Sequence, residues 1–187
     1  MHEKPLHVII ASKDLSYYAH EHPIIQANGS YGLQYSFPAG GEYVVFADYT
    51  PVHAANNVQR YSIQVKGDIP ESKNFTTQQL TAQTDGYTVT LQAEEPHLEV
   101  GKTQAFKAII TKNGIVEKNL ENIMGAKAHL VILSVDTKQY IHVHPEETNN
   151  PIQSFHGYFE RGGLYRGFLQ FQTDGKVHTA AFTLYVQ

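Results

Sequence analysis

The chain consists of short apolar segments, rich in β-branched and aromatic residues, that polar turn residues separate from end to end. The clearest segments are Val44–Ala47, Tyr61–Val65, Tyr87–Leu91, Ala105–Ile110 and Ala181–Val186. Turn dipeptides between them include Asn28-Gly29, Asp85-Gly86, Asn113-Gly114 and Asp174-Gly175. Such a pattern predicts antiparallel strands joined by hairpins, and therefore an all-β protein. Only around residues 116–123 does the apolar spacing become helical, which predicts at most a turn or two of helix within a loop.

The same pattern occurs twice in the chain. His7–Asp14 returns 122 residues later as His129–Asp136, and Tyr18–Pro23 returns as Tyr140–Pro145. An internal repeat of this length indicates two copies of one structural unit. We therefore predict two tandem antiparallel β-sandwich domains of immunoglobulin-like or cupredoxin-like type.

The domain boundaries follow from the repeat. We expect a first β-sandwich repeat at residues 1–66, a linker at 67–85 and a second repeat at 86–187. The linker lacks any sustained apolar period. Roughly forty residues of strand-like sequence precede the second copy but not the first, so we expect the first repeat to be truncated at its N-terminus.

Histidines recur at the same places in both copies. His7 and His129 start strands that are apolar on both faces, which is typical of central, covered strands. Each copy then carries a His-x-His-Pro doublet. In an extended segment the two imidazoles of such a doublet lie on one face, roughly 6.5 to 7 Å apart at the backbone. This spacing suits chelation of one metal ion.

Further ligands have to come from elsewhere in each copy. The predicted metal ligands are His129, His142, His144, His178, His7, His20, His22 and His53. Side chains expected to support them from a second layer are Glu146, Glu147, Tyr140 and Tyr18. Because Glu146 and Glu147 follow only the second doublet, we expect the second site to be the tighter one.

Composition limits the metal ligands and the partners that the chain can have. The chain has no Cys, so imidazole nitrogen and carboxylate oxygen are the strong ligands available, and the affinity order favours copper, with zinc next. With 14 Lys and Arg in 187 residues and a net charge of −4, the sequence has no basic stripe, which excludes nucleic acid as a partner. No apolar run is long enough for a transmembrane segment.

A structural role for the histidines is the alternative. A histidine on an apolar strand is often a core or rim residue whose ring nitrogens bond to backbone carbonyls, and a duplication copies such residues as faithfully as ligands. For His7 and His129 the two roles are equally supported by the sequence, whereas the doublets favour metal.

The repeated pattern resembles a known family. A strand that opens with His, followed by Tyr-x-His-x-His-Pro at residues 18–23 and 140–145 and later by Phe-x-x-Gly-Gly-x-Tyr, is similar to bacterial secreted or lipid-anchored tandem β-sandwich proteins. That resemblance implies an envelope protein that handles copper, an extracytoplasmic location reached through a leader or lipid anchor, and an envelope metal acceptor as partner. A homodimer is a further possible partner, because an open sheet edge in the short first copy would favour pairing with a second chain.

Taken together, these features predict a non-catalytic, extracytoplasmic binding protein for a divalent transition metal. One alternative is a metal-free structural or protein-interaction β-sandwich. A second is a cupin-like metal enzyme, which the His-x-His doublets resemble, although Glu146 and Glu147 follow His144 too closely for that pattern.

Overall fold

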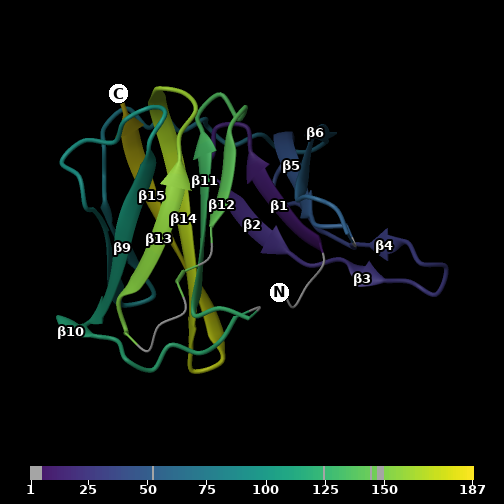
Figure 1. The fold of residues 1–187 in the computed structure, drawn as a ribbon. Helices are drawn as coiled ribbons and strands as arrows, with labels where there is room; N and C mark the ends of the chain where they lie inside the picture. Colours follow the sequence, from purple (N-terminus) through teal and green to yellow (C-terminus); the bar gives the residue numbers. More distant parts are fainter. Residues whose placement is uncertain (1–5, 52, 124, 144, 147–149) are drawn as a thin grey trace. The chain divides into compact units, whose positions relative to one another are not determined.

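A computed structural model describes residues 6–51, 53–123, 125–143, 145–146 and 150–187 (Figure 1). It is all-β, as the sequence predicts. Two compact units, Met1–Asn74 and Phe75–Gln187, divide the chain. The strands of the first unit are β1 (Leu6–Ser12), β2 (Tyr18–Glu21), β3 (Ile24–Ile25), β4 (Tyr31–Gly32), β5 (Gly41–Tyr49) and β6 (Asn57–Val65). Those of the second are β7 (Thr81–Thr84), β8 (Tyr87–Ala93), β9 (Thr103–Lys112), β10 (Ile115–Val116), β11 (Ala128–Ser134), β12 (Tyr140–Val143), β13 (Gln153–Tyr158), β14 (Gly163–Thr173) and β15 (Lys176–Val186).

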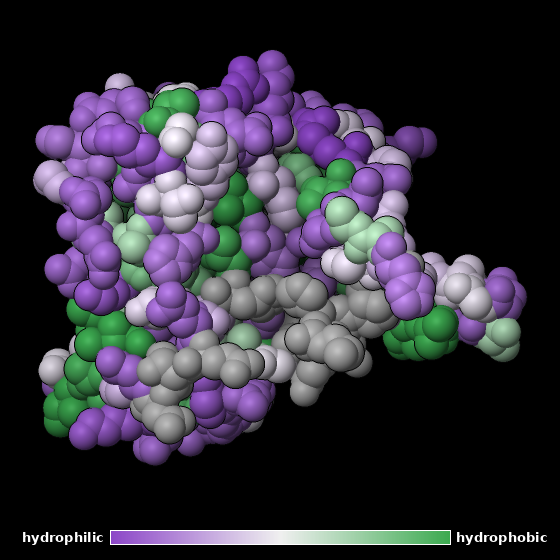
Figure 2. Space-filling view, viewed as in Figure 1, coloured by the Kyte–Doolittle hydropathy of each residue, from purple (hydrophilic) through white to green (hydrophobic). Residues whose placement is uncertain are grey.

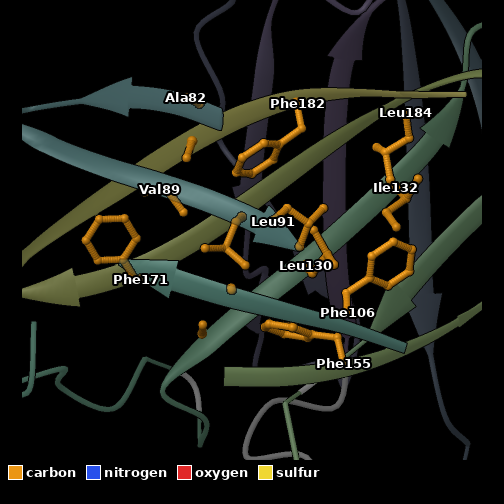
Figure 3. Packing of buried hydrophobic residues seen from close by; sticks show 14 of the residues in the cluster. Ala82, Val89, Leu91, Phe106, Leu130, Ile132, Phe155, Phe171, Phe182 and Leu184 are labelled. Carbon is orange, nitrogen blue, oxygen red and sulfur yellow. The ribbon is translucent and has the colours of Figure 1, made fainter. Parts of the chain in front are cut away.

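The second unit is a two-sheet β-sandwich. One sheet has the strand order β12-β11-β14-β15, and the other has the order β10-β9-β8-β7, with β13 also paired to β9. Alternate side chains of both sheets point inward and form one core, as Figure 3 shows. Phe106 and Phe155 from one sheet and Leu130 and Phe182 from the other all belong to this core, and each is at most 1% exposed. Burial of this apolar layer holds the sandwich together.

The first unit contains a four-stranded antiparallel sheet of order β2-β1-β5-β6, from which the β3–β4 hairpin extends (Figure 1). This sheet has the same order and register as β12-β11-β14-β15. Leu6 pairs with Tyr49 in β1–β5, and the residues 122 positions later, Ala128 and Phe171, pair in β11–β14. The internal repeat is therefore a repeat of this sheet.

The repeated turn residues have structural roles. Tyr43 donates its hydroxyl hydrogen bond to the carbonyl of Ala39 at 3.0 Å, and Tyr165 donates to the carbonyl of Arg161 at 2.6 Å. These bonds resemble the tyrosine corner of immunoglobulin-like sandwiches. Each Tyr follows a Gly-Gly pair whose second member adopts positive φ (φ 129° at Gly41).

Two expectations from the sequence need correction. The predicted linker at residues 67–85 contains β7, and the second unit already begins at Phe75, because polar Thr and Gln residues can form an edge strand without an apolar run. The predicted helical turn near residues 116–123 is absent from the described part of that segment. Instead, Glu121 forms a β-bridge with Gln172, and apolar Leu120 is buried in the core.

Among the described residues, no helix has the length and apolar character that crossing a bilayer requires.

Candidate metal centre

The β1–β2 hairpin brings the first histidine and the first doublet together. In its register, Ile9 pairs with His20 and Val8 with Glu21, so the next pair along would be His7 and His22. Side chains alternate along a strand, and directly paired residues share a face. His7, His20 and His22 consequently lie on one face of the same sheet.

Three ring nitrogens converge there. His7 Nδ1 lies 2.9 Å from His20 Nε2 and 3.0 Å from His22 Nε2. The three ring centroids are 4.8 to 5.1 Å apart. His7 is buried, whereas His20 and His22 are half-buried. One ring of the cluster is therefore enclosed by protein, and the other two are partly accessible to solvent.

His7 and His20 are members of a histidine group whose ligand atoms are close enough to hold a metal ion. His22 Nε2 lies at a similar distance from His7 Nδ1. Two nitrogens bound at about 2.0 to 2.1 Å with tetrahedral angles lie about 3.3 Å apart. The observed separations are only a few tenths of an ångström shorter, so small ring rotations would admit an ion. The same distances also permit His20 and His22 to donate hydrogen bonds to His7 Nδ1 when no ion is bound.

The second unit repeats part of this geometry. His142 Nε2 lies 3.4 Å from His129 Nδ1, with the ring centroids 5.7 Å apart. His129 Nε2 lies 2.8 Å from the carbonyl oxygen of Ile123, and since a carbonyl only accepts, Nε2 carries the proton. His129 Nδ1 therefore presents its lone pair toward His142. His144 lies outside the described residues.

Both units thus use the same ring atoms. Nδ1 of the central-strand histidine, His7 or His129, faces Nε2 of the first doublet histidine, His20 or His142. A backbone carbonyl that fixes the tautomer of a ligating histidine is common around protein metal sites.

Asp48 is a site residue that sequence reasoning missed. It pairs directly with His7 across β1–β5 and lies on the same face of the sheet. Its side chain is buried and accepts a hydrogen bond from Asn56 Nδ2 at 2.9 Å. The signal available in the sequence was a carboxylate inside the otherwise apolar stretch Tyr43–Tyr49.

His178 does not join the cluster, which corrects the prediction that it is a ligand. It lies on the core side of β15, opposite Phe171, with which its ring stacks. Its Nδ1 lies 2.8 Å from Asp85 Oδ2 and its Nε2 lies 3.0 Å from Thr173 Oγ1. Tyr87 in turn lies 2.8 Å from Thr173 Oγ1.

This Asp-His-Thr arrangement is structural. Thr173 and Tyr87 are 4% and 3% exposed, so no substrate reaches the hydroxyls. The hydrogen bond from His178, followed by that from Lys176, lowers the pKa of Asp85. The network therefore joins the turn before β8 to the β14–β15 hairpin.

The other predicted residues are dispersed. His53 is exposed in the β5–β6 connection with φ 62°, apart from the three converging rings. Glu146 Oε1 lies 3.4 Å from Nδ1 of His156, and Glu147 lies outside the described residues.

The two tyrosines predicted to support the sites lie near them. Tyr18 shares the face of His20, and the ring of Tyr140 meets the edge of His142 at 6.2 Å. Burial raises the pKa of Tyr18 above its ordinary value, so its hydroxyl stays protonated and is not an anionic ligand.

A hollow of about 370 Å³ lies elsewhere, on the second unit. Glu95, His97 and Tyr185 are its ionisable lining residues, and the rest of its wall comes from residues such as Leu80 and Pro96.

Comparison with known proteins identifies a family, but the function of that family is unknown. The sequence profile of a family described as "Domain of unknown function (DUF8832)" matches residues 82–187. No curated protein matches the chain.

Proposed function

Because the chain belongs to this family of unknown function, whose match spans more than half of its length, we propose its role from geometry: non-catalytic binding of a divalent transition metal. The ligands proposed in the first unit are His7, His20 and His22. The observation that carries the proposal is the approach of two doublet nitrogens to His7 Nδ1 at 2.9 and 3.0 Å.

The repeat supports the same role for the second unit. His129 and His142 occupy the equivalent strands with the same ring atoms facing each other, and His144 would complete the set by sequence. A hydrogen-bonded core histidine needs no such partner pairing, whereas a chelate needs the rings on one face.

We propose copper as the ion, with zinc next. The donors are imidazole nitrogens without thiolate, and among divalent ions such a set binds Cu(II) most tightly. Asp48, beside His7, adds an oxygen that can orient a ring or join the ion.

The setting we propose is extracytoplasmic. It rests on the resemblance of the Tyr-x-His-x-His-Pro motif to envelope metal-handling proteins. Delivery to an acceptor protein fits sites of nitrogen ligands in which the described doublet rings are only half-buried. The cupin-like alternative has less support, since Glu146 and Glu147 follow His144 too closely in the sequence for that pattern.

The test is titration of metal-stripped protein with Cu(II) and Zn(II) by calorimetry, with electron paramagnetic resonance of the Cu(II) form to count nitrogen ligands. We expect two ions per chain. The double variant His20→Ala/His22→Ala should lose one of them, with affinity at that site falling by about 100-fold or more, the equivalent of about 2.7 kcal/mol.

Two variants serve as controls. His53→Ala removes an exposed histidine of the same unit and should leave both sites intact. His142→Ala/His144→Ala should remove the other ion. If wild type and both double variants bind equally weakly, the histidines are structural and the metal proposal is wrong.

A further inference from the structure

The two repeated sheets place different residues opposite their central histidine. In the first unit, Asp48 of β5 pairs directly with His7 of β1. In the second unit the residue 122 positions later, Gln170 of β14, pairs directly with His129 of β11. Directly paired residues share a face, with their Cβ atoms about 4.5 to 5.5 Å apart. The repeat therefore keeps this position but exchanges a carboxylate for a neutral amide.

Both side chains at this position are buried. Asp48 is 4% exposed and Gln170 is 7% exposed. The surface drawn in Figure 2 is mainly hydrophilic, and a charged residue on such a surface needs no particular explanation. A carboxylate enclosed by protein is different, because water screens its charge from a neighbouring ion much less. An ion held at His7 would therefore be attracted by Asp48 more strongly than by a surface carboxylate.

Hydrogen bonds orient each of the two side chains. Asp48 Oδ1 accepts a hydrogen bond from Asn56 Nδ2 at 2.9 Å. An amide donor orients a carboxylate without neutralising its charge. Gln170 donates a hydrogen bond from Nε2 to Thr179 Oγ1 at 3.3 Å, and it carries no charge. The difference between the two positions is therefore mainly electrostatic.

We propose that Asp48 makes the site at His7 the tighter of the two and selective for divalent ions. With Gln170 in the same position, the site at His129 is weaker and is the first to release its ion. This inference rests on the proposed function, and it reverses the order of affinity that the sequence predicts from the two glutamates after the second doublet.

The physical reason is that the Coulomb energy between a fixed carboxylate and a bound ion is proportional to the charge of the ion. The factor by which the carboxylate raises the affinity for a divalent ion is consequently the square of its factor for a monovalent ion. Loss of a residue that supports metal ligands typically lowers affinity about 10- to 100-fold.

The test compares Zn(II) with Ag(I), a monovalent ion that also binds imidazole, by calorimetry of the metal-stripped full chain in chloride-free buffer. Asp48→Asn keeps the shape of the side chain and an oxygen acceptor for Asn56, and it removes the charge. It should lower the Zn(II) affinity of the tighter site about 100-fold and the Ag(I) affinity only about tenfold. A merely structural role of Asp48 would lower both affinities by the same factor.

Two further variants complete the test. Gln170→Glu introduces the carboxylate at the weaker site and should raise its Zn(II) affinity at least about tenfold. Asp68→Asn removes the same charge from an exposed position of the first unit and should change neither affinity by more than about twofold.

The possible outcomes separate this inference from the proposed function. Equal losses of Zn(II) and Ag(I) affinity in Asp48→Asn, or no loss, would overturn the role of Asp48. The metal-binding proposal would then still stand, because the wild type would still bind its ions. If the wild type binds neither ion, the metal-binding proposal is wrong and this inference is wrong with it.

Discussion

Leu184 and Ile63 are equivalent residues of the two repeated sheets, and they test the difference in burial between these sheets. They occupy equivalent positions opposite Tyr165 and Tyr43, yet Leu184 is fully buried and Ile63 is 38% exposed. Truncation of either to Ala removes three carbons. At about 0.8 kcal/mol per buried methylene, full transfer amounts to about 2.4 kcal/mol, and the enclosed cavity raises the cost of Leu184→Ala to about 3 kcal/mol.

Ile63→Ala should cost much less. More than a third of its residue surface is already in water, and solvent fills the space that the truncation opens, so we expect about 1 kcal/mol. The difference of about 2 kcal/mol corresponds to about 30-fold in an equilibrium constant.

Native-state hydrogen exchange is the suitable assay, because a chain of two units need not unfold in one step. Amides of β14 and β15 report on the second unit, and those of β5 and β6 report on the first. The reasoning is refuted if the two substitutions destabilise their own units equally, to within roughly 0.5 kcal/mol, which is the error expected for comparing independent sites.

Three further changes test the turns and the buried network. Burial by itself would raise the pKa of Asp14. Hydrogen bonds from Ser12 and from backbone amides outweigh burial and lower this pKa to about 2. Stability from Asp14 is therefore present above pH 3.8 and is lost as the pH falls toward 2. Asp14→Asn should cost about 1 kcal/mol near neutral pH, after allowance for solvent screening, and acid titrations of both proteins should converge below pH 2. Gly40→Ala should destabilise the first unit by about 2 kcal/mol in urea titrations, since a Cβ would lie 2.3 Å from the carbonyl oxygen of Gly67. Gly162→Ala, whose Cβ would meet no atom closer than 3.4 Å, should be nearly neutral, and equal losses would contradict the steric argument. His178→Ala should cost about 2 to 3 kcal/mol by loss of two buried hydrogen bonds and leave the number of bound metal ions at two; a lost ion would restore His178 as a ligand.

Local pattern was sufficient for much of this protein. Short apolar segments and turn dipeptides predict the all-β class, and the repeat predicts two copies of one unit. The structure shows that the repeated element is a four-stranded sheet. The doublet also predicts its own geometry, because alternation along an extended chain places His20 and His22 on one face. His7 is only 13 residues from His20, so a single hairpin sets their approach.

Non-local contacts were decided by the tertiary structure. His178 and Asp85 are 93 residues apart, and whether His178 faces the core depends on the register of β15 against β14. A shift of one residue would reverse that choice, and an alternating sequence does not reveal the register. Asp48 likewise becomes a site residue only because β5 pairs with β1.

The layer that covers each repeated sheet is likewise decided by the tertiary structure and not by the sequence of the strand. The sequences of β6 and β15 both alternate apolar and polar residues, so each predicts a sheet with one face to bury. Only the folded chain shows that β15 lies under a second sheet while the face of β6 remains exposed. Alternation along a strand is a property of neighbouring peptide units, whereas the layer that packs on it comes from residues far away in the chain, and that pairing is determined by the tertiary fold.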